Sequence, residues 1–208
     1  LIGMGRGLIA DPEWVNKVEF GDECDIRKCI SCNIGCAGHR IGINRPIRCT
    51  VNPSVNGGED YKKQKINKPC NVVVIGGGTA GLEAACTAAE VGCTTFLIEK
   101  KPELGGLAAL ISKIPDKKRL ADFPNYLIHR ASKLKNLFIF KTTEATIEMI
   151  RSMNPNIIVN ATGSNPLLPP IKDLHENIDK EGGKVSSITN MINHVMEYPE
   201  DLKGKKVV

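Results

Sequence analysis

Residues 71–100 read NVVVIGGGTAGLEAACTAAEVGCTTFLIEK, and this stretch decides the fold. The apolar run NVVVI predicts a buried strand, GGGTAG predicts a tight turn, and LEAACTAAEVG predicts an alanine-rich helix that stops at Gly92. TTFLIEK predicts a second strand. A strand, a helix and a strand in so short a span form a βαβ unit, whose two strands are parallel. We therefore expect an α/β protein built on a Rossmann-like parallel sheet with helices.

The glycine turn of this unit has the spacing G-x-G-x-x-G of a dinucleotide site. The first glycine permits the tight turn, the second lets a pyrophosphate approach the backbone, and the third lets the helix lie close to the strand. An acidic residue, Glu99, follows the second strand, where it could accept both ribose hydroxyls of an adenosine. The alternatives are a turn that binds nothing and a plain surface acid. The predicted nucleotide-binding residues are Gly76, Gly78, Thr79, Ala80, Gly81, Glu99 and Lys100.

The sequence after this unit predicts further strands of the same sheet, whereas the sequence before it predicts a different kind of segment. LFIFKTT from Leu137 and NIIVNATG from Asn156 predict further strands, with a short helix in EATIEMIRSM between them and another helix over residues 188–196. The closing GKKVV resembles the start of a second unit of the same kind. Ahead of the sheet, residues 1–20 predict a short strand, a glycine-rich turn through Gly7 and one helix. A polar linker is expected over residues 59–69.

Five of the eight cysteines lie in a segment with little periodicity, residues 21–58, where we expect loops and short helices. Four of them have the spacing C-x2-C-x3-C-x12-C: Cys29, Cys32, Cys36 and Cys49. Three thiols in one loop and a distant fourth favour a cubane iron–sulfur cluster. The alternative is zinc, which usually takes two separated C-x2-C pairs. Cys24 and His39 are further candidate ligands, whereas Cys70, Cys86 and Cys93 are expected to be buried apolar residues.

The composition of the chain argues against membrane proteins, secreted proteins and nucleic-acid-binding proteins. The chain has 208 residues, 41% of them hydrophobic, and a formal net charge of +5 from scattered lysines with few aromatic residues between them. Lysines distributed in this way are more typical of an ordinary solvated surface than of a nucleic-acid-binding surface. No apolar run reaches the length of a membrane span and no signal peptide is recognisable, so we expect a cytoplasmic protein without membrane or nucleic-acid partners.

Glu99 is followed by a Gly-Gly pair and, much later, by an A-T-G strand end, as in flavoproteins related to the disulfide reductases. By that resemblance these residues surround FAD: Gly105, Gly106, Ala161, Thr162 and Gly163. The chain departs from the family at Asp173, where a glycine is usual. The nucleotide segment has no Cys-x-x-Cys pair, which argues against thiol–disulfide chemistry.

The order GRGLIADP, the cysteine pattern, CTVNP and VVVIGGGTAGLEAA resembles one family in particular. It is that of the iron–sulfur flavoenzymes of the old yellow enzyme superfamily, such as 2,4-dienoyl-CoA reductase, NADH:flavin oxidoreductases and trimethylamine dehydrogenase. The resemblance implies three parts: a C-terminal remnant of an FMN-binding TIM barrel over residues 1–20, an iron–sulfur segment and linker over residues 21–66, and an incomplete FAD-binding domain over residues 67–208. Gly5 and Arg6 match the turn that holds the FMN phosphate.

The same resemblance implies a mechanism. NAD(P)H would reduce FAD, and electrons would pass through a [4Fe-4S] cluster to FMN, which would reduce an activated C=C bond of a small molecule or acyl-CoA. The family's proton donors would precede residue 1, so the chain would contain no catalytic acid and would be inactive alone. An oligomer through surfaces exposed by truncation is a further expectation. The alternatives are an amine dehydrogenase, with electrons running from FMN through the cluster to an electron-transfer protein, and a non-catalytic cofactor-binding module.

Overall fold

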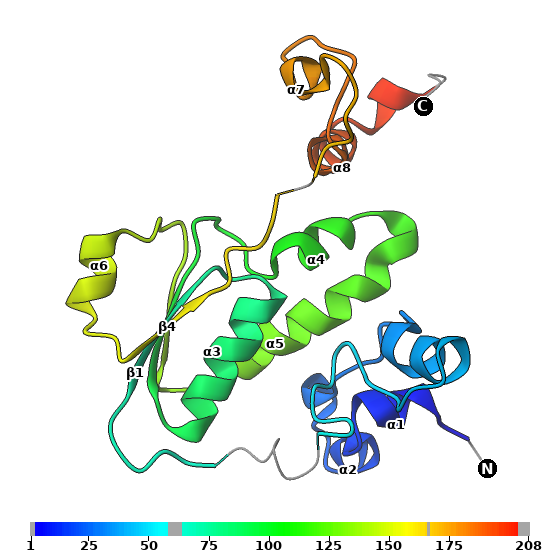
Figure 1. Ribbon diagram of the computed structural model, residues 1–208. Coiled ribbons are helices and arrows are strands. Elements are labelled where there is room, and N and C mark those ends of the chain that lie inside the picture. The colour runs from blue at the N-terminus through cyan, green and yellow to red at the C-terminus, as the bar shows by residue number, and fades with distance from the viewer. Residues whose placement is uncertain (1–2, 58–63, 166, 204–208) are drawn as a thin grey trace.

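A parallel sheet lies at the centre of the structure, a computed structural model that describes residues 3–57, 64–165 and 167–203 (Figure 1). Its four strands have the order β3-β2-β1-β4 and pair in parallel throughout. They are β1 (Asn71–Ile75), β2 (Thr94–Ile98), β3 (Leu137–Phe140) and β4 (Ile157–Asn160). All four strands were predicted, and the α/β class with its parallel sheet is confirmed. Strand β3 ends earlier than predicted, close to Thr142, which has a φ of 53° that a strand does not accommodate.

One face of the sheet is covered by two helices, α3 (Thr79–Val91) and α5 (Asp122–Ser132), which pack against each other (Figure 1). Helix α3 connects β1 to β2 and ends at Gly92, as predicted. Alanine and glycine on α3 let it lie close to the strands, and α5 closes the layer. The buried core between them includes Val72, Val74, Leu82, Ala85, Leu97 and Leu127.

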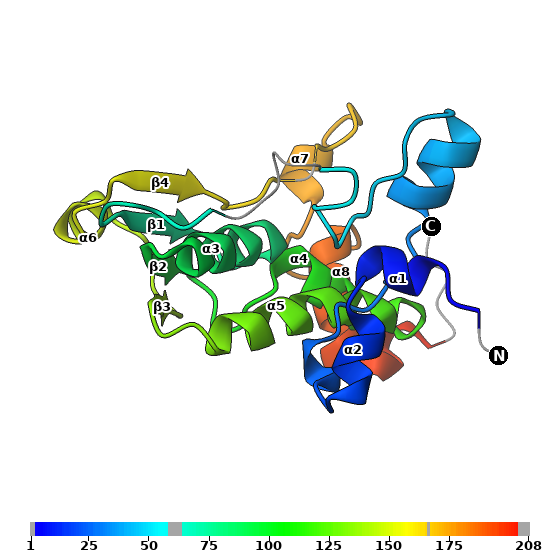
Figure 2. The same ribbon diagram turned by 90° about the horizontal axis from the view of Figure 1, so that it is seen from below.

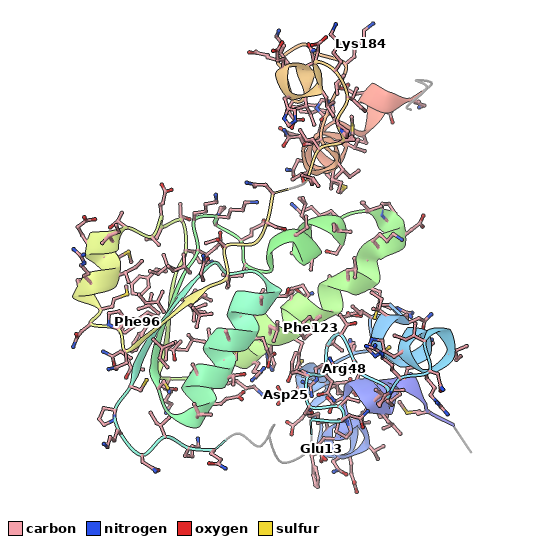
Figure 3. All side chains as sticks on the ribbon, in the orientation of Figure 1. Glu13, Asp25, Arg48, Phe96, Phe123 and Lys184 are labelled. Carbon is pink, nitrogen blue, oxygen red and sulfur yellow. The ribbon has the colours of Figure 1, made fainter. Side chains whose placement is uncertain are left out.

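The opposite face of the sheet carries aromatic and aliphatic side chains. Phe96 and Phe138 stack there with ring centroids 5.6 Å apart, and Figure 3 marks Phe96 on the sheet. Phe138 and Ile158 are about half exposed. The hydrophobic core therefore lies on the helical side of the sheet.

No helix was predicted for the segment between β2 and β3. It holds α4 (Gly106–Ile111), a 3-10 segment η4 (Pro115–Ala121) and α5. Between β3 and β4, the predicted short helix is α6 (Ile147–Ser152), which begins where the Thr146 hydroxyl accepts a hydrogen bond from Met149 N at 3.2 Å.

The N-terminal part consists of short helices and loops: α1 (Arg6–Ala10), α2 (Trp14–Glu19), the 3-10 turn η1 (Glu23–Asp25) and the π-helix η2 (Ile34–Gly42). No strand occurs among its described residues, as expected for the cysteine-rich segment. The predicted glycine-rich turn is wrong at Gly7, which lies inside α1. The carbonyl of Gly7 accepts the amide of Asp11 at 2.9 Å, so the backbone is already helical there.

The C-terminal part forms α7 (Leu174–Asn177), α8 (Ile188–Glu197) and η5 (Pro199–Leu202), set apart from the sheet (Figure 1). Helix α8 confirms the helix predicted over residues 188–196. Three predictions lie wholly or partly outside the described residues: the strand at residues 1–2, part of the linker (residues 59–63) and the second unit at residues 204–208. Within the described ranges, no helix is both long and apolar enough to cross a membrane.

Candidate functional site

The glycine turn after β1 packs against the end of β4. Gly76 has a φ of +104°, and a Cβ there would lie 2.3 Å from the carbonyl oxygen of Ala161. A Cβ at Gly81 would lie 1.8 Å from the carbonyl oxygen of Gly76. A Cβ at Gly78 would meet nothing closer than the Gly106 Cα at 3.9 Å. Two of the motif glycines are thus required by backbone contact, and the third leaves its backbone accessible at the start of α3, beside Thr79 and Ala80.

Glu99 lies just after β2 with its carboxylate turned toward this turn. Its Oε2 accepts a hydrogen bond from Gly77 N at 2.6 Å, and its Oε1 accepts one from Lys101 N at 2.8 Å. The side chain is buried. Each carboxylate oxygen has a further lone pair, so the group can still accept hydrogen bonds from a ligand. Gly77 was not among the predicted residues, although the run of three glycines pointed to it.

The Gly-Gly pair is brought to the glycine turn, as its predicted role requires. Gly105 forms a parallel bridge with Gly78, and its amide donates to the Gly77 carbonyl at 2.8 Å. A Cβ at Gly106 would lie 2.9 Å from the Gly78 Cα, so this backbone approach excludes a side chain. The two turns therefore form one continuous surface at the carboxyl ends of the strands.

Thr162 and Gly163 follow β4 and are exposed. The Thr162 amide and hydroxyl both donate to the Asn160 side-chain oxygen, at 3.2 and 2.9 Å. Further along, Asp173 has a φ of 60°, so an aspartate adopts here the left-handed conformation for which the family's glycine is suited.

A cleft of about 200 Å³ opens beside Glu99. Its lining includes residues from the segment after β3, which were not predicted to belong to the site. One of them, Thr143, donates its backbone amide to the Glu99 carbonyl at 3.0 Å. Parallel strands end at the same edge of a sheet, so the predicted strand β3 could have indicated that the residues after it lie near Glu99. The lining residues are Ile75, Gly76, Ile98, Glu99, Lys100, Thr143, Glu144, Ala145 and Thr162.

The four patterned cysteines line one pocket in the N-terminal part. Cys24, in η1, is exposed and outside it, and His39 Nδ1 lies 3.3 Å from the Pro46 carbonyl oxygen. No disulfide forms among the described cysteines. The pocket is lined by Arg6, Ile9, Cys29, Ile30, Cys32, Asn33, Gly35, Cys36, Arg48, Cys49, Thr50 and Val51.

Gly35 explains how the distant fourth cysteine reaches the loop. A Cβ at Gly35 would lie 2.6 Å from the Arg48 carbonyl oxygen, and Arg48 N donates to the Gly35 carbonyl at 2.7 Å. This contact places Cys36 beside Cys49. Sequence reasoning missed Gly35, because nothing local to it signals an approach from residue 48.

The cysteine sulfurs have polar neighbours. Ser31 N donates to Cys29 Sγ at 3.4 Å, and Cys32 Sγ lies 3.2 Å from Thr50 Oγ1. Within the described part of the chain, no three Cys, His, Asp or Glu side chains are arranged to hold a single metal ion. The four patterned cysteines share one pocket.

The remaining cysteines lie in the nucleotide-binding part. Cys86 and Cys93 are buried there and Cys70 is half-buried. Burial, with Cys70 as a neighbour, raises the pKa of the Cys93 thiol, which disfavours its reactive thiolate form. These cysteines behave as small apolar residues.

The predicted phosphate turn lies next to the cysteine pocket. Gly5 precedes α1 and Arg6 is its first residue, with the Arg6 guanidinium donating to the Asn33 side-chain oxygen. A second, open pocket is lined by Met4, Gly5, Arg6, Gly7, Cys29, Ser31 and Arg119. Arg119 comes from η4 of the nucleotide-binding part, so this pocket joins two parts of the chain.

Polar contacts hold the cysteine-rich part against α5. Asp25 accepts hydrogen bonds from His129 Nε2 at 2.8 Å and from Lys133 Nζ at 2.5 Å. The Arg27 guanidinium lies over the Tyr126 ring, 5.6 Å from its centroid. Figure 3 labels Asp25 and Arg48 in the part that flanks α5, and Figure 2 shows the β4 arrow pointing toward the same side of the molecule. The cysteine-rich part is thus attached to the nucleotide-binding part through α5.

Comparison with known proteins agrees with this arrangement. Residues 71–133 match the family model described as FAD dependent oxidoreductase. The chain is 43% identical to NADH oxidase of Thermoanaerobacter brockii over 82% of its own length and 26% of the relative's. The solved structure of a 2-naphthoyl-CoA reductase complex is similar, with a TM-score of 0.80, 30% identity, and coverage of 93% of this chain and 28% of that one. Histamine dehydrogenase from Rhizobium sp. 4-9 gives a TM-score of 0.75 at 29% identity, over 86% of this chain and 27% of that one.

The chain thus spans about a quarter of the length of each of these relatives. The matches include both the nucleotide-binding segment and, in the reductase structure, nearly all of the chain. They show that the chain contains an FAD-dependent oxidoreductase domain whose relatives are iron–sulfur flavoenzymes of the old yellow enzyme and trimethylamine dehydrogenase type.

Proposed function

We propose that this chain carries the FAD site and the iron–sulfur site of an NAD(P)H-dependent oxidoreductase that reduces an activated C=C bond, in 2,4-dienoyl-CoA or a related enone. One observation carries the proposal: a four-cysteine pocket and a dinucleotide turn with its acidic partner are held together in one chain. The overall route of electrons is from NAD(P)H to FAD, then through a [4Fe-4S] cluster to FMN. Similarity to NADH oxidase and to 2-naphthoyl-CoA reductase supports this direction.

The nucleotide-binding residues fit FAD. Backbone amides at Gly78, Thr79 and Ala80 begin α3, where the helix dipole favours a pyrophosphate. The Glu99 carboxylate is fixed by two backbone amides and can accept the ribose hydroxyls. Lys100 borders the same cleft. By the family resemblance, Gly105 and Gly106 would border the pyrophosphate from the other side, and residues 161–163 would border the flavin side.

The cysteine pattern fits a cluster better than a single zinc ion. Structural zinc sites usually take two separated Cys-x2-Cys pairs, whereas here three cysteines lie in one loop and the fourth follows at a distance. All four line one pocket. Cysteine thiolates are the usual ligands of a cubane iron–sulfur cluster. Cys29, Cys32, Cys36 and Cys49 would hold the cluster, which supplies one-electron transfer when bound.

The remaining assignments follow from the same family. Gly5 and Arg6 would contact the FMN phosphate. They belong to the first of three proposed parts: the barrel remnant at residues 1–20, the iron–sulfur segment at residues 21–66 and the FAD domain at residues 67–208. The donor hydride, the FMN and the reducible substrate would be handled largely by regions that the relatives have beyond this segment, since the chain spans only about a quarter of them. We place the protein in the cytoplasm.

An anaerobic preparation of the chain tests the proposal directly. After reconstitution with iron, sulfide and FAD, we expect FAD and about four irons and four sulfides per chain, with broad absorption from the cluster. Cys36→Ser should lose iron and sulfide and keep FAD, whereas the control Cys24→Ser, at an exposed position outside the pocket, should keep both. Zinc in place of iron and sulfide would refute the cluster, and failure to bind FAD would refute the flavin site.

Similarity to histamine dehydrogenase favours a second candidate function. In an amine dehydrogenase, electrons would run outward from FMN through the cluster to an electron-transfer protein, and the nucleotide site would hold ADP. Chromatography of the nucleotide released from protein purified without added cofactor separates the two candidates: FAD supports the reductase, and ADP without FAD supports the dehydrogenase.

A further inference from the structure

The Ser31-Cys32-Asn33 turn is held between two arginine side chains from different parts of the molecule. Arg6, at the start of α1, donates to the Asn33 side-chain oxygen. Arg119, from η4, donates from its Nη1 to Ser31 Oγ at 2.7 Å, across 88 positions of sequence. The cysteine between the two contacted residues is one of the four that line the pocket.

The turn needs outside support. Ser31 has a φ of 56° and Asn33 a φ of 57°, so both flank Cys32 in the left-handed conformation. That region is costly for a residue such as serine and persists where surrounding contacts fix it. The bond from Arg119 is therefore placed where it can set the conformation of the loop that presents Cys29 and Cys32.

The surroundings of the four cysteines are positively charged. Arg6 and Arg48 line the cysteine pocket, and Arg119 lines the neighbouring pocket that also contains Cys29. None of the residues that line these two pockets is acidic. Arginine stays protonated under all ordinary conditions, so its charge is a fixed feature of the site.

A fixed positive charge beside a thiolate-held cluster acts on its redox equilibrium. Reduction adds negative charge to a group that already carries four thiolates, and a nearby cation stabilises the reduced form more than the oxidised form. Arg119 differs from the other two arginines because it belongs to the part of the chain that would hold FAD.

We propose that Arg119 is a positioning residue through which the nucleotide-binding domain fixes the cysteine loop and raises the reduction potential of its iron–sulfur cluster. The inference rests on the proposed function, because it requires a cluster on Cys29, Cys32, Cys36 and Cys49. It adds a role for η4, a segment that contains none of the predicted cofactor ligands.

The test is a potentiometric titration of the reconstituted 208-residue chain, followed by electron paramagnetic resonance of the reduced cluster. Arg119→Gln removes the charge and keeps a hydrogen-bond donor, and we expect about a tenfold shift of the reduction equilibrium toward the oxidised cluster, or about 59 mV for one electron. Arg119→Lys keeps the charge and should stay close to the parent chain. Lys118→Gln is the matched control, because it removes a charge from an exposed neighbour in η4 that lines neither pocket.

The outcomes separate this inference from the proposed function. A parent chain that binds no iron and sulfide overturns both. A clustered parent chain whose potential is the same in Arg119→Gln overturns the role of Arg119 and leaves the cluster assignment intact. If Arg119→Gln cannot hold a cluster, Arg119→Lys decides: a normal potential supports the role of the charge, and a loss of cluster or a lowered potential contradicts it.

Discussion

Glu99 Oε2 accepts a hydrogen bond from Gly77 N at 2.6 Å, which joins the end of β2 to the turn that follows β1. The bond fixes a buried carboxylate at the carboxyl edge of the sheet. Gly77 itself is closely packed, because a Cβ there would lie 2.6 Å from Leu104 Cδ2 and 3.0 Å from Glu99 Cβ. The acid and the glycine turn thus form one closely packed unit.

Glu99→Gln should weaken FAD binding by about 10- to 100-fold. The substitution removes the charge from an acceptor of ribose hydroxyls, and hydrogen bonds to charged groups are worth about 1.5–3 kcal/mol. It also turns one acceptor oxygen into an amide donor, which would face the Gly77 or the Lys101 amide. Quenching of flavin fluorescence during a titration of apoprotein with FAD measures the dissociation constant. Glu103→Gln, at an exposed carboxylate, is the control, and equal affinities for the two variants would contradict the role of Glu99.

Gly81→Ala should destabilise the chain by about 2 kcal/mol or more. Its Cβ would lie 1.8 Å from the Gly76 carbonyl oxygen, so α3 must move away from the turn, and overpacking of this kind costs about 1–3 kcal/mol. Chemical denaturation followed by circular dichroism gives the free energy of unfolding. Gly42→Ala, where a Cβ would meet nothing within 4 Å, serves as the control. A Gly81→Ala chain as stable as the parent would mean that helix and strand are not in this contact.

Much of the sheet could be predicted because its strands are short apolar runs, three of them with a glycine close to one end. The turn from Gly76 to Gly81 has the spacing of a known backbone geometry, and the structure reproduces that geometry. Helix α5 could not be predicted in the same way. It contacts the core with Leu127 and Ala131, and its other anchor is Arg130, whose Nη1 contacts Glu83 at 2.9 Å. The position of α5 therefore depends on its contacts with α3 more than on the periodicity of its own sequence.

The candidate sites were predictable to the extent that local spacing encodes them. The cysteine pattern brought four residues to one pocket, and Glu99 was found by its place after a strand. Gly35 and Arg119 were missed because their contacts join residues far apart in sequence: the Arg48 carbonyl in one case and Ser31 in the other. A single sequence carries no local mark of such pairs.

Gly35→Ala should reduce the iron and sulfide content while FAD binding stays unchanged. The new Cβ would lie 2.6 Å from the Arg48 carbonyl oxygen, which is backbone and cannot move aside as a side chain could. The strain would separate Cys36 from Cys49 without touching the nucleotide turn. Iron, sulfide and flavin assays on the same reconstituted sample measure both sites, with Gly42→Ala as the control. Full iron content in Gly35→Ala would show that this close approach is not needed to assemble the ligands.

Asp25 should make the chain less stable in acid, through its contacts with α5. The hydrogen bond from Lys133 is the main cause that holds the pKa of Asp25 below its usual value of 3.8, and burial opposes it only in part. Because the pKa in the folded chain lies below that of the unfolded chain, the ionised carboxylate stabilises the fold above about pH 4, and this contribution disappears as the pH falls through the folded pKa.

The parent chain should therefore melt at a higher temperature than Asp25→Asn near pH 6, and the difference should shrink toward zero as the pH falls through the lowered pKa of Asp25, below which the group is protonated in both folded and unfolded chains. Thermal melting at a series of pH values measures it. Asp116→Asn removes an exposed carboxylate from the first turn of η4 and should differ little from the parent across the range. A difference between the parent and Asp25→Asn that persists unchanged at low pH would show that the ionised form of Asp25 does not carry the contact, because only a charge-dependent contact is lost on protonation.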